Sequence, residues 1–209
     1  MCARVSLAGR RMQDTNRGFA QELNNILRQM KKETASIKLD KSKMRDAVVV
    51  GMSDGALGNL PNGASQGGLV VCVRDYEGTA SHLIGHESKR IRRVVGSSLA
   101  SETIQARTLL DRTTWVRDLF HEITGDRMRI ILKTDCESLV KQVYSLSNVQ
   151  RDRLLTKDVY AMRQAISTGV IYSLSHIQAA FNEADAFTRV PCHWRRQQIR
   201  DMAEGKVSN

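Results

Sequence analysis

The sequence has few of the residues that mark small disulfide-linked, zinc-binding or disordered proteins. Of its 209 residues, four are cysteine and two are proline. The cysteines are scattered and form no C-x-x-C pair, so neither a zinc knuckle nor a disulfide framework is predicted. Scattered cysteines also favour a reducing, intracellular compartment. The scarcity of proline argues against long disordered linkers.

Aromatic residues and long apolar runs are also scarce. Aromatics make up 5% of the chain, so a core built from Val, Ile, Leu and Ala is expected. No apolar run approaches the roughly 18 residues of a membrane span, and no signal-peptide core follows Met1, which predicts a soluble protein without a membrane partner. The first twelve residues carry three arginines and no acid. This is compatible with a mitochondrial address, beside the nucleus or the cytoplasm.

Basic residues exceed acidic ones. The chain has 32 Lys and Arg against 22 Asp and Glu, a formal net charge of +10. Such a balance attracts phosphate polyanions more readily than acidic metabolites, so nucleic acid is the expected partner. The alternative on charge alone is a basic protein without a polyanionic partner.

Hydrophobic periodicity predicts an α/β domain. Apolar runs of strand length predict strands at 47–52, 68–73, 80–85, 128–132 and 170–177. Helical spacing predicts helices at 15–32, 98–122, 137–146, 151–167 and 183–189, the second with Ser98 as its N-cap. Three strands, a helix, a strand, two helices, a strand and a helix fit a mixed sheet flanked by helices.

Extensions precede and follow this domain. Residues 1–46 form a basic N-terminal extension with an amphipathic helix, which is expected to pack in cis or on another chain. Residues 47–190 form the main domain. Residues 191–209 form a basic tail with helical character at 194–206.

Four acidic residues lie on four separate predicted elements and could converge on one point. Asp54 and Asp135 follow apolar strands, and Glu102 shares a helix face with apolar residues. Asp185 opens the last helix. Hydrolysis of a phosphodiester needs an activated water and a stabilised leaving oxygen, and carboxylates holding two Mg²⁺ ions about 4 Å apart serve both needs. Each acid taken alone is more simply explained as a helix cap or a surface charge, so it is the set of four that favours this chemistry.

Six short stretches occur in one order over residues 48–189. They are S-D-G-A-L-G-N (53–59), S-Q-G-G (65–68), S-K-R-I-R-R-V-V (88–95), S-L-A-S-E (98–102), T-D-C-E-S-L (134–139) and N-E-A-D-A-F-T-R (182–189). In these stretches the chain resembles the ribonuclease H domain of copia-type retrotransposon polyproteins. The resemblance implies an α/β fold with a ribonuclease H-like mixed five-stranded sheet flanked by helices, here with helical N- and C-terminal extensions.

The resemblance also implies a site and a substrate. Asp54, Glu102, Asp135 and Asp185 would be the catalytic, metal-binding residues for two Mg²⁺ ions, with Mn²⁺ as an alternative. The substrate would be the RNA strand of an RNA–DNA hybrid. The first motif departs from the family at residues 55–57, Gly-Ala-Leu, which is expected to loosen the wall beside Asp54.

Two groups of basic residues are candidates for nucleic-acid contacts. They are Lys89, Arg90, Arg92 and Arg93 before the helix with Glu102, and Arg195 and Arg196 in the tail. The alternatives are a solvated strand edge for the first group and a tail docked on the core for the second. His176, nine residues before Asp185, is expected to pack or hydrogen-bond rather than to act in catalysis.

Two functions follow from these observations. The first is a Mg²⁺-dependent endonuclease, a phosphodiester hydrolase acting on hybrid RNA. The second is a domesticated, non-catalytic fold that serves as a structural or RNA-binding subunit of a ribonucleoprotein, for example an organellar ribosome. No polymerase motif is present, so the chain is either a polyprotein fragment or a stand-alone gene.

Overall fold

The computed structural model describes residues 17–32, 46–60, 63–75, 77, 80–145, 152–189, 201 and 204. Apart from residues 201 and 204, the predicted tail helix at 194–206 lies outside the described residues, as do Arg195 and Arg196. The predicted N-terminal helix is present as α2 (Arg17–Lys32). The domain boundaries at residues 46 and 190 stay predictions.

The main domain is built on a five-stranded mixed sheet in the order β3-β2-β1-β4-β5. Its strands are β1 (Val48–Ala56), β2 (Gln66–Arg74), β3 (Ser81–Arg90), β4 (Arg129–Thr134) and β5 (Ser173–His176). β1 pairs antiparallel with β2, and β2 with β3, whereas β4 is parallel to both β1 and β5. The predicted mixed five-stranded sheet is confirmed.

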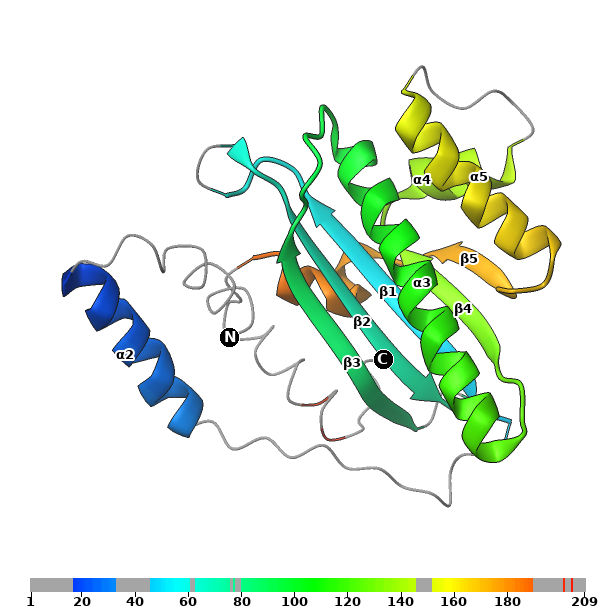
Figure 1. The fold of residues 1–209 in the computed structure, drawn as a ribbon, viewed down its shortest axis with the longest axis horizontal. Helices are drawn as coiled ribbons and strands as arrows, with labels where there is room; N and C mark the ends of the chain where they lie inside the picture. The colour runs from blue at the N-terminus through cyan, green and yellow to red at the C-terminus, as the bar shows by residue number, and fades with distance from the viewer. Residues whose placement is uncertain are drawn as a thin grey trace.

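Helices cover one face of this sheet. They are α3 (Ser98–Thr124), α4 (Glu137–Tyr144) and α5 (Arg153–Ser167). Figure 1 shows α3 lying across the sheet, with α4 and α5 beside it. The larger core cluster lies between these helices and the sheet and consists almost wholly of aliphatic residues, as the composition predicts. No helix among the described residues is long and apolar enough to cross a membrane.

A smaller core cluster covers the opposite face. It joins apolar residues of β1, β2 and β3 to Ala184, Ala186 and Phe187. These last three belong to η4 (Glu183–Phe187), a 3-10 helix that follows the shorter η3 (Ala179–Phe181). The sequence predicted an ordinary helix at 183–189. The tighter turn places Ala184 and Phe187 against the sheet.

Several element boundaries differ from the prediction in ways that matter for the site. β1 continues to Ala56, because Asp54 and Gly55 pair with Gly68 and Gly67 of β2, so Asp54 lies within the strand rather than after it. The N-cap of α3 is Ser97, whose Oγ accepts a hydrogen bond from the Ala100 N–H at 3.1 Å, and not Ser98. β5 has four residues, about half the predicted length.

Candidate metal centre

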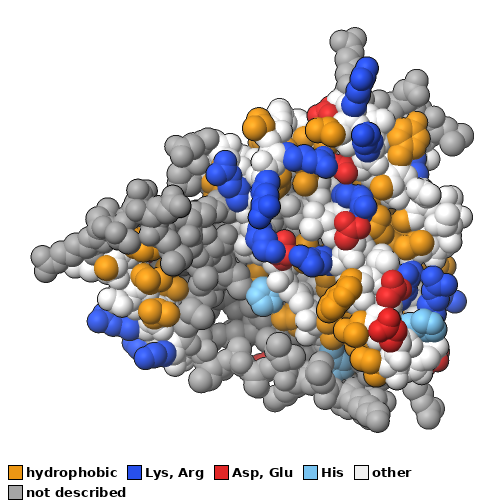
Figure 2. All heavy atoms as spheres, in the orientation of Figure 1, with side chains coloured by type: hydrophobic (Ala, Val, Ile, Leu, Met, Phe, Trp, Pro, Cys, Tyr) orange, Lys and Arg blue, Asp and Glu red, His pale blue; other side chains and the backbone are white. Residues whose placement is uncertain are grey.

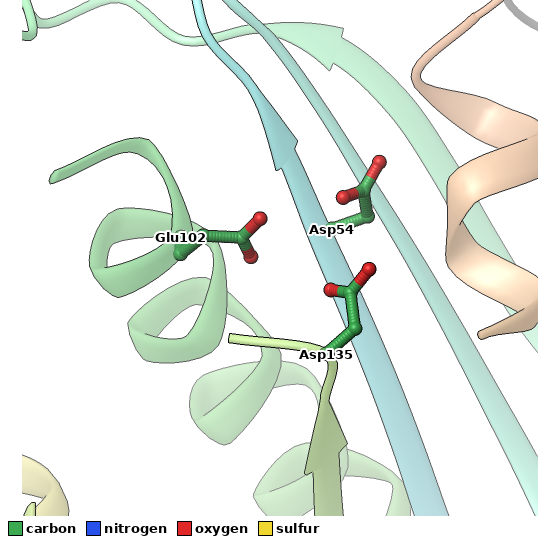
Figure 3. A group of neighbouring side chains, drawn as sticks. All are labelled: Asp54, Glu102 and Asp135. Atoms are coloured by element: carbon green, nitrogen blue, oxygen red, sulfur yellow. The ribbon is translucent and has the colours of Figure 1, made fainter. Parts of the chain in front are cut away.

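Three of the four predicted acids come together at one edge of the sheet. Asp54 on β1, Glu102 on α3 and Asp135 directly after β4 each offer a carboxylate oxygen, and these oxygens lie within 4.8 Å of one another. Figure 3 shows Glu102 extending from α3 toward Asp54 and Asp135, which lie on the adjacent β1 and directly after β4. Asp54 and Glu102 are buried and Asp135 is half-buried. Because β1 and β4 are parallel neighbours, their carboxyl ends bring Asp54 and Asp135 to the same edge.

Glu102 reaches the two aspartates because α3 packs directly on the backbone of β1. The Ser101 hydroxyl donates to the Gly55 carbonyl at 2.7 Å. A Cβ atom on Gly55 would lie 2.5 Å from the Ser101 carbonyl carbon and 2.7 Å from the Glu102 nitrogen. The sequence predicted a looser wall beside Asp54 at residues 55–57. At Gly55 the backbone of α3 fills the space that a side chain would take, so the wall is not loosened at that position.

Asn182 and Thr188, which flank η4 at its two ends, hydrogen-bond to the aspartates from the side opposite α3. The Thr188 hydroxyl donates to Asp54 Oδ2. The Asn182 amide Nδ2 donates to Asp135 Oδ1 at 3.1 Å and to the Ser53 carbonyl at 3.0 Å. Both residues lie in the motif N-E-A-D-A-F-T-R, but no role was predicted for them. Their hydrogen-bonding side chains on either side of Asp185 are the signal that could have suggested one.

The electrostatics of the group favour a bound cation. Burial first, and then the negative charges of Asp54 and Asp135, raise the pKa of Glu102 to about 9. Burial also raises the pKa of Asp54, an effect that the Thr188 hydrogen bond and the Arg189 charge partly offset. Glu102 Oε2 is buried and has no hydrogen-bond partner among the described residues.

This donor set fits a hard divalent ion. Mg²⁺ and Mn²⁺ prefer carboxylate oxygens, and a cation among three acids removes their mutual repulsion. The unpartnered Oε2 of Glu102 is available as a ligand atom. The described residues therefore fit the divalent metal that the sequence predicts, while the number of ions stays a prediction.

The fourth predicted acid, Asp185, lies outside this group of three. It is buried in η4, and its Oδ1 is 3.4 Å from Arg189 Nε. Arg189 is also close enough to lower the pKa of Asp54, so Asp185 is near the site without joining the cluster. Its role as a metal ligand stays a prediction.

His176 ends β5 with an exposed side chain. The predicted packing role is therefore not supported. Its charge contributes to the lowered pKa of Glu137, which is caused mainly by the hydrogen-bonded Lys141.

The first basic group lies on the strand and loop that lead into α3. Lys89 and Arg90 end β3, and Arg92 and Arg93 follow it; all four are exposed. Figure 2 shows Lys and Arg side chains gathered over β3 and the first half of α3. Two of the four have acidic neighbours, because Lys89 pairs with Glu87 at 2.8 Å and Arg93 with Asp158 at 2.7 Å. Arg90 and Arg92 have no ion-pair partner among the described residues.

Comparison with known proteins gives structural neighbours only. No protein-family profile and no curated protein sequence matches the chain. The ribonuclease H1 of Halobacterium salinarum NRC-1 is 21% identical with a TM-score of 0.47, over 66% of this chain and 92% of that chain. LC11-RNase H1 in complex with an RNA/DNA hybrid is 20% identical, with a TM-score of 0.46 and the same coverage.

A viral protein is also among the neighbours. The foamy viral protease-reverse transcriptase, in complex with an RNA/DNA hybrid, is 12% identical with a TM-score of 0.47. The match covers 82% of this chain and 21% of that one. The fold class itself stands on the strand order and directions described above.

Proposed function

We propose that this protein is a divalent-metal-dependent ribonuclease H-type endonuclease that cleaves the RNA strand of RNA–DNA hybrids. The observation that carries the proposal is the group of Asp54, Glu102 and Asp135, whose carboxylate oxygens lie within 4.8 Å of one another. This group lies at the carboxyl ends of two parallel strands, in a sheet of ribonuclease H-like order. That position supports the same function. A copia-type origin is part of the proposal and depends on the six sequence motifs.

The three acids would hold Mg²⁺ or Mn²⁺, and Asp185 is the proposed further ligand for a second ion. When bound, such ions activate a water nucleophile and stabilise the leaving oxygen of the phosphodiester. Thr188 and Asn182 hold the carboxylates of Asp54 and Asp135 in fixed orientations through their hydrogen bonds. Glu102 enters from the opposite side on a rigid helix, so the three donors are arranged before a ligand arrives.

The basic group before α3 is the proposed substrate contact. Arg90 and Arg92 have exposed side chains and are available to phosphates. Contacts of this kind position a duplex without reading its base sequence. Discrimination of RNA from DNA would then depend on helix shape and on the 2′-hydroxyl groups.

A cleavage assay on a labelled RNA–DNA hybrid tests the proposal. The protein of residues 1–209 should cut the RNA strand in Mg²⁺ and fail to do so in EDTA. Asp135→Asn should lower the rate at least about 100-fold, which corresponds to about 2.7 kcal/mol in the activation barrier. Glu137→Gln is the matched control, because Glu137 is an acid two residues away whose side chain is 62% exposed and pairs with Lys141. It should cleave like the unmodified protein.

Two results would contradict the proposal. One is cleavage that Asp135→Asn leaves unchanged. The other is tight, salt-sensitive binding of RNA with no Mg²⁺-dependent cleavage, which is the behaviour expected of a non-catalytic ribonucleoprotein subunit.

A further inference from the structure

A buried ion pair lies on the sheet face that η4 covers, outside the three-acid group. Arg74 Nη2, at the end of β2, is 3.0 Å from Glu183 Oε1 and 3.1 Å from Oε2. Only 12% of the Arg74 side chain and 2% of the Glu183 side chain are exposed. Arg74 Nε also donates to Ser81 Oγ on β3 at 3.1 Å. The guanidinium group therefore ties the beginning of η4 to two strands.

Stability alone does not explain such a pair. Removing two charges from water costs about as much as their attraction returns, and replacing a buried pair by apolar residues is often neutral or stabilising. What a buried pair supplies is a fixed geometry, because any displacement leaves a charge without its partner. The role of the pair therefore depends on which segment it keeps in a fixed position.

What it holds is the segment that contacts the two aspartates. Glu183 directly follows Asn182, whose amide donates to Asp135 and whose Oδ1 accepts from the Ala184 N–H. The same short segment ends at Thr188, whose hydroxyl donates to Asp54.

Hydrogen bonds also hold the C-terminal end of this segment, which spans residues 182–188. Asn59 Nδ2 donates to the Thr188 carbonyl at 2.8 Å, and Ser88 Oγ donates to the Phe187 carbonyl. In the middle, a Cβ atom on Gly68 would lie 2.6 Å from the Ala184 carbonyl oxygen, so the segment lies directly on β2. The Arg74–Glu183 pair thus fixes the beginning of a segment whose middle and end are fixed by other contacts.

We propose that Arg74 and Glu183 are positioning residues for the metal centre: they hold η4 so that Asn182 and Thr188 keep the carboxylates of Asp135 and Asp54 at the spacing that a divalent ion needs. This inference rests on the proposed function, but it concerns residues that touch neither the metal nor the substrate.

The test uses the whole chain of residues 1–209 and measures Mn²⁺ binding by calorimetry or electron paramagnetic resonance. The informative variant is the double substitution Arg74→Met with Glu183→Leu, because it removes both charges and leaves neither buried alone. Its melting temperature should stay within a few degrees of the unmodified protein. Its Kd for Mn²⁺ should rise at least about tenfold, the usual effect of removing the residues that orient metal ligands.

A matched control and a second readout separate positioning from general damage. Asp111→Asn removes an acid from the exposed Arg107–Asp111 pair on α3 and should leave the Kd for Mn²⁺ within about twofold. Hydrogen–deuterium exchange should show faster exchange of the η4 amides in the double variant and unchanged exchange in β1 and β4. A folded double variant that binds Mn²⁺ like the unmodified protein would overturn the positioning role.

The two proposals fail in different ways. If the unmodified protein binds Mn²⁺ and the double variant binds it weakly, but neither cuts a hybrid, the nuclease function fails and the positioning role stands. If the unmodified protein cuts the hybrid and the double variant binds Mn²⁺ equally well, the positioning role fails and the nuclease function stands.

Discussion

At the scale of single residues, Glu102 has the environment that most favours a bound cation. It is 8% exposed, and one of its carboxylate oxygens has no hydrogen-bond partner among the described residues. A hydrogen bond from the Gly55 backbone only partly offsets burial and the two neighbouring aspartates, so the pKa of Glu102 is raised to about 9. Without a cation, the ionised form of Glu102 therefore destabilises the folded protein.

The raised pKa predicts how the metal-free protein responds to pH. Since the pKa of Glu102 is higher in the folded than in the unfolded protein, the folded protein binds more protons between about pH 4.5 and pH 9. The free energy of unfolding should therefore fall as the pH rises through this range. Glu102→Gln removes the titration and should raise the stability in EDTA at pH 8, by on the order of 2 kcal/mol.

Thermal melts of the two proteins at pH 5 and pH 8 check this. The gain from Glu102→Gln should be large at pH 8 and small at pH 5. An equal gain at both values, or no gain at pH 8, would show that Glu102 is not a destabilising buried carboxyl.

The acids of the site could be predicted from sequence, but their hydrogen-bond partners could not. The sequence indicates Asp54, Glu102 and Asp135 because each follows a predicted strand or lies on the apolar face of a predicted helix. Thr188 lies 134 residues from Asp54, and Asn182 lies 47 residues from Asp135. Nothing local in the sequence pairs residues across such distances.

At the scale of elements, the site depends on close approach of backbones to glycines. Gly55 of β1 lies against the first turn of α3, and Gly68 of β2 lies against η4. The two elements thus contact the end of the β1–β2 pair from opposite faces. The sequence could show that residues 55–57 depart from the usual motif, but only the packing shows that the backbone of α3 fills the space beside Gly55.

Gly55→Ala should push α3 away from β1. The added methyl group would overlap backbone atoms of Ser101 and Glu102, which cannot yield as a flexible side chain can. Overpacking of this kind costs about 1–3 kcal/mol, and moving Glu102 should also weaken Mn²⁺ binding. Denaturant melts and Mn²⁺ titrations measure the two effects.

Gly85→Ala is the control for that substitution. Gly85 also lies in a strand, β3, but a Cβ atom there would meet nothing within 4 Å. The free energy of unfolding of the Gly85→Ala variant should differ from that of the unmodified protein by less than about 1 kcal/mol. If Gly55→Ala and Gly85→Ala had the same effect on stability and Mn²⁺ binding, the contact between α3 and β1 would not control the site.

Element types were predicted better than their ends. Over residues 15–189 the apolar runs and helical spacings predicted five strands and five helices in the order found, although the last of these helices is the 3-10 helix η4. The end of β1 was missed because Ser53, Asp54 and Gly55 have low strand propensity, whereas pairing with β2 extends the strand through them. The turn geometry of η4 was missed because contacts with the sheet determine it.

At the scale of the whole molecule, a chain with a net charge of +10 contains a small, largely buried acidic site. Basic side chains gather over β3 and α3, where the proposed nucleic-acid substrate would lie, whereas the carboxylates would need a cation before a phosphate could approach. Composition predicts nucleic acid as the partner, and the fold decides which of the described basic residues are exposed together.

Hybrid binding should therefore be salt-dependent, and Arg90 and Arg92 should contribute to that dependence. In Ca²⁺ or EDTA, replacing both by Ala should reduce the slope of log K against log salt by about 2, or about 1 for each arginine that neutralises a phosphate. Arg127→Ala is the control, because Arg127 is exposed in the loop between α3 and β4. An unchanged slope in the double variant would show that Arg90 and Arg92 do not neutralise phosphates in the proposed interface.

The central claim, that Asp54, Glu102 and Asp135 form one divalent metal centre, is tested most directly by crystals grown with Mn²⁺. Anomalous scattering at the manganese edge should give a peak within about 2.5 Å of an oxygen from each of the three residues. The peak should be absent from crystals of Asp135→Asn grown in the same way. Mn²⁺ bound elsewhere while these three carboxylates have no peak, or a peak that persists in Asp135→Asn, would contradict the account.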